Sequence, residues 1–194
     1  MSTPKNFIEA RHRAEWRRWL AKHHTRAQGV WLVTFKKGSG MPHLDNPGAV
    51  EEALCFGWVD SKPAKVDERR TNLCFALRKP GSGWSKLNKE RIAWLIDSGA
   101  MEAAGLRKIA AAKEDGSWSK LDAVEAVEIP PDLARAFSHH HGSAAHFDAF
   151  PRSAKRGILE SILQAKRSET RARRIGETAT LAARNERANQ SRRK

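Results

Sequence analysis

Residues 53–62, "ALCFGWVDSK", decide the fold, because an apolar run ends there at Gly57 and a β-prone run follows it. Upstream, apolar residues recur with the helical period, and Asp45 or Asn46 before Pro47 is typical of a helix start. Gly57 is a favourable helix end, since glycine adopts the left-handed backbone conformation without a steric penalty. The stretch therefore predicts a buried helix that turns into a strand.

The same stretch holds Cys55, which raises the question of a reactive thiol. A nucleophilic cysteine needs a cation or a helix N-terminus beside it. Cys55 instead lies toward the C-terminal end of the expected helix, among Leu54, Phe56 and Trp58, and such surroundings raise a thiol pKa. We therefore predict that Cys55 is a buried core residue and that this stretch has a structural role.

Further strands and helices are expected on both sides of this stretch. Alternating or β-branched runs predict strands, and apolar spacings of three and four predict helices. We expect strands at 29–37, 58–67 and 72–80, and helices at 7–24, 85–99 and 102–116. The first 122 residues are thus predicted to be a mixed part with a small antiparallel sheet and packed helices.

An acidic, valine-rich connection at 123–132 is the best candidate boundary, and everything beyond it is predicted to be helical. A single long helix is expected from about Ala154, because small and branched apolar residues recur along it. The fold class is therefore α+β, with an α+β domain at 1–122 and an all-helical region at 123–184. A basic tail at 185–194 is predicted to be disordered.

Charge is the strongest compositional signal, with a formal net charge of +14 over 194 residues. Residues 151–194 hold thirteen Lys and Arg against four Glu. Such an excess favours polyanionic partners, either nucleic acid or a phosphorylated small ligand. The first twenty residues carry charge throughout, which predicts no membrane insertion, and both cysteines lie in apolar runs. We expect a protein of the reducing cytoplasm.

The first candidate site is "FALRKPGSGWSKLNKER", residues 75–91, in which a strand, a turn and a helix start follow one another. Arg78 and Lys79 precede the turn, and Ser85 and Lys86 open the helix. Backbone N–H groups, the positive helix end and these cations together make an anion site. The alternative is an ordinary capped turn with solvated cations, and the glycine–lysine–serine order of a phosphate loop is absent.

An enzyme is the alternative to a binding protein. Its pocket would lie around Asp60, Arg78, Lys79 and Asn88, between a strand pair and the helix that begins at 85. The sequence shows no nucleophile paired with a base, so a non-enzymatic role is favoured. No cofactor is predicted.

A second candidate surface is the basic helix at 165–177. Arg167, Arg171 and Arg174 recur at i, i+4 and i+7, a spacing that allows them to follow a row of phosphates. Two alternatives remain: a solvated helix with internal salt bridges, or a helix that docks on the N-terminal part and leaves Arg171 or Arg174 buried against a carboxylate such as Asp60. The histidines at 139–141 are expected in an exposed loop, without a metal.

Several ordered motifs resemble one known family. "VWLVTFKK", "EEALCFGWVDS", "RKPGSGWSKLNKERIAWLIDSG", "IPPDLARAF" and "AKRSETRARRI" occur in that order, and the resemblance runs from about Trp16 to Leu181. Together they resemble the YdeI/OmpD-associated, or bacteriocin-protection, family. One departure is Ala76-Leu77-Arg78, where members commonly carry Thr-Pro-Arg, so the turn lacks a rigid proline.

The resemblance implies an α+β part followed by a small helical region. It also implies an association with envelope stress and with resistance to cationic antimicrobial peptides. It implies no established reaction, cofactor or catalytic residue. The sequence therefore predicts a stress-associated protein that binds an anionic partner through its basic surfaces.

Overall fold

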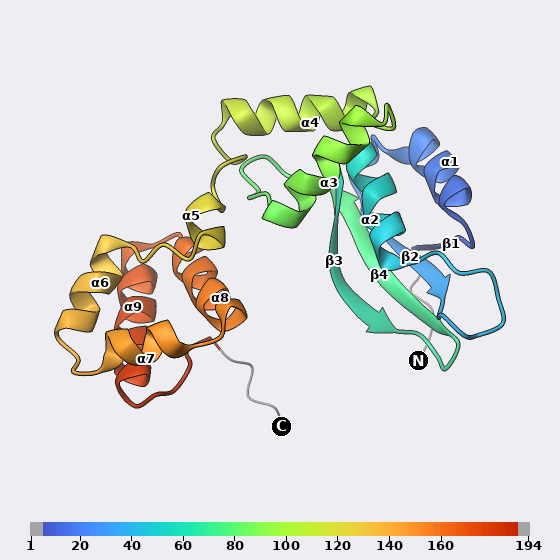
Figure 1. Ribbon diagram of the computed structural model, residues 1–194. Helices are drawn as coiled ribbons and strands as arrows, with labels where there is room; N and C mark the ends of the chain where they lie inside the picture. Colours follow the sequence, from blue (N-terminus) through green and yellow to red (C-terminus); the bar gives the residue numbers. More distant parts are fainter. Residues whose placement is uncertain (1–5, 190–194) are drawn as a thin grey trace. The chain divides into compact units, whose positions relative to one another are not determined.

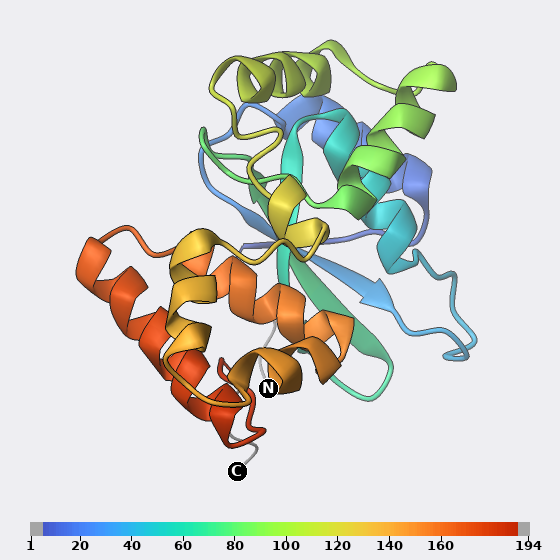
Figure 2. The ribbon, with the colours of Figure 1, turned by 60° about the vertical axis from the view of Figure 1, so that its left-hand side comes forward.

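The computed structural model describes residues 6–189 and divides the chain into two compact units, Met1–Lys120 and Leu121–Lys194 (Figure 1). Each unit has its own hydrophobic core. The first unit combines a sheet with helices, and the described part of the second is helical (Figure 2). The α+β class is therefore confirmed for the N-terminal part.

The sheet of the first unit has four strands among the described residues, in the order β1-β2-β4-β3. They are β1 (Phe7–Glu9), β2 (Val30–Phe35), β3 (Trp58–Lys65) and β4 (Arg70–Leu77). Strand β4 pairs antiparallel with both β2 and β3, but β1 runs parallel to β2. The sheet is thus mixed: the predicted antiparallel pairing is present between β4 and its two neighbours, and the parallel strand β1 is a correction to the predicted antiparallel sheet.

Strand β1 also corrects the helix predicted from residue 7. Phe7 and Ile8 are paired with Trp31 and Leu32 of β2, and helix α1 (Arg13–His23) begins only afterwards. The helical spacing was real within α1, where Trp16 and Leu20 are buried. Its extension to Phe7 was coincidental, because a three-residue strand is stabilised by its partner strand and leaves no periodicity of its own.

Three more helices complete the first unit: α2 (Asn46–Cys55), α3 (Lys86–Asp97) and α4 (Ala103–Glu114). The predicted start of α2 is confirmed, because the Asp45 carboxylate accepts a hydrogen bond from the Gly48 N–H at 2.9 Å. Its predicted end is confirmed as well, since Gly57 has φ +75° directly before β3.

Helix α1 packs on the sheet through large aromatic side chains. The Trp16 ring lies 5.2 Å from the Phe75 ring of β4, and Trp19 meets Trp58 edge-on at 5.9 Å. Cys55 is fully buried in this core, and burial is the main cause that raises the pKa of its thiol. The prediction of a buried, unreactive Cys55 is confirmed in its burial.

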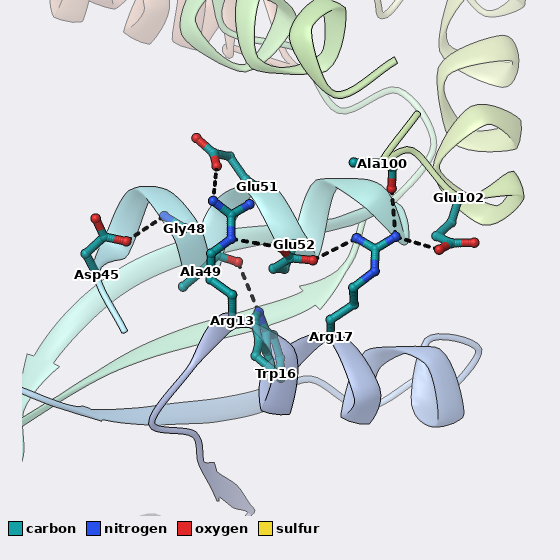
Figure 3. Close-up of polar contacts among 10 residues, drawn as sticks. All are labelled: Arg13, Trp16, Arg17, Asp45, Gly48, Ala49, Glu51, Glu52, Ala100 and Glu102. Atoms are coloured by element: carbon teal, nitrogen blue, oxygen red, sulfur yellow. Dashed lines mark hydrogen bonds and ion pairs between the residues drawn. The ribbon is translucent and has the colours of Figure 1, made fainter. Parts of the chain in front are cut away.

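Charged side chains fasten α1 to α2 (Figure 3). The Glu52 carboxylate, 6% exposed, accepts from Arg13 Nε at 2.9 Å and from Arg17 Nη1 at 2.8 Å. Arg17 Nη2 also donates to Glu102 Oε1 at 2.6 Å and to the Ala100 carbonyl at 2.8 Å. The arginines and carboxylates neutralise one another here, so this cluster is a structural clamp.

The described part of the second unit consists of five helices: α5 (Asp122–Glu125), α6 (Pro131–Ser138), α7 (Ser143–Ala149), α8 (Arg152–Leu163) and α9 (Ser168–Ala183). Leu133, Phe147 and Ala179 are fully buried at its centre. The single long helix predicted from about Ala154 was wrong, because the chain leaves the helix after Leu163 and re-enters it at Ser168.

The segment after α9 returns onto the second unit. Ala188 is buried in its core, and the Asn189 side chain donates to the Gly157 carbonyl at 3.0 Å. Residues 185–189 of the predicted tail therefore pack on the unit, and residues 190–194 lie outside the described part of the chain. Among the described residues, no helix combines the length and the apolar character that crossing a bilayer requires.

Candidate functional site

Arg78 directly follows β4 and is 5% exposed. Its backbone N–H donates to the Gly57 carbonyl at 3.0 Å, which extends the strand pairing by one residue. Its guanidinium carbon lies 3.7 Å from the centre of the Trp84 ring, a close cation–π contact. The end of the strand and an aromatic surface thus hold a positive charge inside the unit.

The hydrogen bonds of this guanidinium leave one edge unused. Within the described residues they all come from Nη1, which donates to the Gly83 carbonyl at 3.0 Å and to the Ser82 carbonyl at 3.5 Å. Nε is buried and has no acceptor. No carboxylate of the described residues forms an ion pair with Arg78 within 4 Å, and Arg78 is therefore a buried cation without a counter-ion.

The electrostatics of Arg78 agree with this geometry. Desolvation by burial lowers the pKa of Arg78 to about 10, and the negative charge of Asp60 opposes that shift. A buried charge is costly unless it is paired. An anion at the unused edge of Arg78 would consequently offset part of this cost.

A small pocket opens at this guanidinium, with a volume of about 40 Å³. We call it the Arg78 pocket, and its polar and aromatic lining residues are Arg78, Lys79, Trp84, Lys108, Asp115 and Ser117. The Trp84 indole Nε1 is a second buried donor without an acceptor. Three cations and one carboxylate therefore line this recess, and two buried donors without acceptors belong to its lining residues Arg78 and Trp84.

The turn between β4 and α3 is held firmly against α4. Asp115 Oδ2 accepts from the Gly81 N–H at 3.0 Å, and Lys120 Nζ donates to the Gly81 carbonyl at 3.0 Å. Asp115 Oδ1 accepts from the Ser117 N–H at 2.8 Å. A hydrogen bond from the Ser117 side chain is the largest of the causes that lower the pKa of Asp115. Asp115 therefore organises the pocket wall.

More positive charge gathers beside the pocket. The Trp118 ring lies 5.2 Å from Trp84, and the ammonium groups of Lys89 and Lys113 lie 5.3 and 5.6 Å from the Trp118 ring centre. Trp84 itself is almost fully buried, so it is a wall of the site and no platform for a stacked base. Trp94, at 55% exposure, is the outward-facing tryptophan of α3.

Of the four predicted anion-site residues, the structure brings two into the pocket. Arg78 and Lys79 line it. The Ser85 hydroxyl instead accepts from the Asn88 N–H and caps α3, and Lys86 is exposed 3.9 Å from Glu90. Sequence reasoning missed Lys108 and Asp115, which come from α4 and from the residue after it, because no local pattern links them to the turn.

Asp60 of the alternative enzyme site does not line the Arg78 pocket. Within the described residues, no group of three or more histidine, cysteine or acidic side chains is placed to hold a metal ion. The His139–His141 run follows the end of α6. The pocket thus offers cations and N–H donors, with one carboxylate that already accepts two backbone hydrogen bonds.

Two of the three arginines predicted to contact phosphates make internal contacts instead. Arg171 donates from Nε and Nη2 to the two oxygens of Asp132, at 2.7 and 3.0 Å. Arg174 Nη1 donates to the Ser161 carbonyl. Arg167 precedes α9 and is exposed. Both contacts lie within the helical unit, and the carboxylate that Arg171 meets is Asp132 and not the suggested Asp60.

Comparison with family models covers most of the chain in two parts. Residues 8–108, more than half of the chain, match the family described as a domain of unknown function, DUF8412. The chain belongs to the DUF8412 family. The Arg78 side of the pocket lies within the matched DUF8412 residues, and Asp115 and Ser117 lie just beyond them.

Residues 126–185 match the family described as bacteriocin-protection, YdeI or OmpD-associated. This match confirms the predicted resemblance but over a shorter stretch of the chain. The sequence motifs had suggested that the resemblance began at Trp16, whereas the match begins at residue 126. A family described by bacteriocin protection fits a stress-related protein. Comparisons with curated proteins and with solved structures gave no match.

Proposed function

We propose that this DUF8412 protein is a non-enzymatic binding protein that holds the oxyanion of a phosphorylated ligand or a nucleic acid in the Arg78 pocket. The observation that carries the proposal is the buried Arg78 Nε, which has no acceptor, in a guanidinium that has no counter-ion among the described residues. A bound oxyanion supplies both.

The free edge of the guanidinium suits this role. An arginine presents Nε–H and one Nη–H side by side, and this fork matches two oxygens of a phosphate or a carboxylate. The Nη1 edge of Arg78 is already bound to the turn carbonyls, which fixes the orientation of the fork. Stacking on Trp84 fixes its plane. A preorganised fork loses little entropy on binding.

The neighbouring charges favour an anion over a neutral ligand. Lys79 and Lys108 line the pocket with Arg78, and Lys89 and Lys113 lie close to Trp118. A concave site with an excess of one charge concentrates ligands of the opposite charge. The alternative, an enzyme around Asp60, Arg78 and Lys79, lacks such support because Asp60 is not part of the pocket.

We also propose where the protein acts and how its parts divide the work. Cys55 and Cys74 are both free thiols, which supports a reducing cytoplasm. An α+β domain over 1–122 would carry the binding site, and a helical domain over 123–184 would link the protein to the bacteriocin protection that is named in the description of the family matched there. Of the three arginines proposed to contact phosphates, Arg167 remains the exposed one.

Calorimetric titration of inorganic phosphate into the protein in chloride buffer tests the proposal. We expect saturable binding at one site. Lys108→Ala should weaken it about three- to tenfold, because it removes one lining cation. Arg107→Ala removes the same charge from the next position on α4, outside the pocket, and should leave the affinity unchanged. The proposal would be contradicted if phosphate showed no saturable binding, or if the two variants lost the same amount of phosphate affinity, because the Arg78 pocket would then not be the phosphate site.

A further inference from the structure

We infer that the group bound in the Arg78 pocket is a terminal phosphate, a phosphomonoester dianion, in preference to a phosphodiester or a carboxylate. This inference rests on the proposed function and names its ligand class. Three features carry it: the depth of the guanidinium, the balance of charge and the arrangement of the free donors.

The small size of the recess favours a terminal phosphate over a phosphate in the middle of a chain. Arg78 is 5% exposed, and the pocket in front of it measures about 40 Å³. That is about three times the volume that a single water molecule needs. A terminal phosphate enters such a recess with three bare oxygens. A phosphodiester carries carbon substituents on two of its oxygens, and both would have to enter the recess.

The charge balance favours a dianion. Three lining cations, Arg78, Lys79 and Lys108, face one lining carboxylate, Asp115. Both oxygens of Asp115 already accept hydrogen bonds from the Gly81 and Ser117 backbone. A phosphomonoester carries about −1.5 to −2 at neutral pH, so it neutralises the remaining excess, whereas a diester or a carboxylate carries about −1.

The donors favour a tetrahedral group. The fork of Arg78 lies in the plane of the guanidinium, whereas the unpartnered Nε1 belongs to the Trp84 ring, whose centre is 3.7 Å from the guanidinium carbon. A planar carboxylate has two oxygens, which the fork alone satisfies. A tetrahedral phosphate has a third oxygen outside the plane of the fork, and it can accept from the ammonium group of Lys79 or Lys108 in the lining.

The test compares four probes on the whole protein by calorimetric titration: inorganic phosphate, methyl phosphate, dimethyl phosphate and acetate. We expect methyl phosphate to bind at least about tenfold more tightly than dimethyl phosphate or acetate, because it brings a second charge into a site with little water. The affinity for methyl phosphate should fall when the pH drops from 7.5 to 5, since the second ionisation of a phosphomonoester lies near pH 6.

A second pair of probes distinguishes the source of the terminal phosphate. A single-stranded octanucleotide with a 5′-phosphate is compared with the same strand carrying a 5′-hydroxyl. Preference for the phosphorylated strand identifies a nucleic acid end as one source, and binding of methyl phosphate alone identifies a small phosphomonoester. Both results support the inference, and Lys108→Ala should weaken either interaction while Arg107→Ala does not.

The inference fails if dimethyl phosphate or acetate binds as tightly as methyl phosphate, or if both octanucleotides bind equally and methyl phosphate does not bind. In that case the pocket still binds anions, and the proposed function stands without its ligand class. If none of the probes, inorganic phosphate included, shows saturable binding, the proposed function fails together with the inference.

Discussion

Replacement of Arg78 by methionine separates a functional cation from a structural one. Methionine keeps a long, flexible side chain in the core but removes the charge. A buried arginine that serves the fold loses an ion pair on such a change, and the cost is about 3–5 kcal/mol. Arg78 has no such pair among the described residues, so we expect a different result.

The magnitude follows from the environment of the guanidinium. Burial lowers the pKa of Arg78 from its ordinary value to about 10. Below pH 10 the charged form is therefore held in the folded state at a cost of about 3 kcal/mol, and this cost disappears as the pH rises above about 10. Methionine removes the cost, but it also removes the contact with Trp84 and the hydrogen bonds to the turn, together worth about 2–4 kcal/mol. The terms nearly cancel.

We therefore expect Arg78→Met to leave the free energy of unfolding within about 1 kcal/mol of the parent value. Urea unfolding in chloride buffer at pH 7.5, followed by tryptophan fluorescence, measures it. All seven tryptophans lie between residues 16 and 118, so the signal reports on the first unit. Phosphate should stabilise the parent protein and leave the variant unaffected, because ligand binding adds stability only to a protein that binds it.

Arg17→Met is the matched comparison, because Arg17 is a paired cation of the same unit. It leaves Glu52 with one arginine and should lower the free energy of unfolding by about 2–3 kcal/mol, allowing for the partial exposure of Arg17. A loss of more than about 3 kcal/mol in Arg78→Met would refute the reasoning, since it would show that the fold itself depends on the charge of Arg78.

Three further predictions concern the cores and the ion pairs. Cys55 should react with a thiol reagent only as fast as the first unit opens, whereas the half-buried Cys74 should react sooner. Rapid labelling of native Cys55 would contradict its burial. Cys55→Ala should lower the free energy of unfolding by about 1–2 kcal/mol. Glu52→Ala should cost about 2–3 kcal/mol in urea unfolding, because two arginines lose their buried partner. Arg171→Ala should cost about 1 kcal/mol, since its ion pair with Asp132 is partly exposed. Arg171 lowers the pKa of Asp132 below 3.8, so this pair stabilises the fold above that pH and its contribution is lost as the pH falls through the lowered value. An acid titration followed by circular dichroism should therefore lose this dependence in the variant.

Several helix ends of the first unit could be predicted from the sequence, because they depend on local chemistry. Asp45 before a proline and Ser85 before α3 predicted two helix starts, because each side chain accepts a hydrogen bond from a backbone N–H three residues later. Gly57 predicted a helix end, since a positive φ is costly for other residues. These signals act over a few residues and need no knowledge of the rest of the chain.

Features that depend on residues far away in the sequence could not be predicted. The pairing of β1 with β2 brings together residues 24 positions apart, and the sequence around Phe7 carries no signal for it. The break between α8 and α9 falls in a polar stretch without proline or glycine, so no local stop was visible. Tertiary packing decides both.

The candidate site likewise combines residues that a local pattern predicted with residues that only the fold brings together. Arg78 and Lys79 were predicted because they precede a turn and a helix start in the sequence. Lys108 and Asp115 reach the pocket from α4 and its C-terminal end. Ser85 and Lys86 do not line it, because Ser85 caps α3 and Lys86 lies near Glu90 on the exposed face of that helix. The missing acceptor of Arg78 Nε is a fact of three-dimensional packing alone.

The most direct measurement is a nitrogen–proton correlation spectrum of the arginine side chains, recorded while inorganic phosphate is added at constant ionic strength. The account predicts that one Nε–H resonance shifts and saturates, and that this resonance is absent from Arg78→Met. It would be contradicted if the Arg78 resonance did not move, or if all arginine resonances moved together without saturation, because phosphate would then meet only the general surface charge.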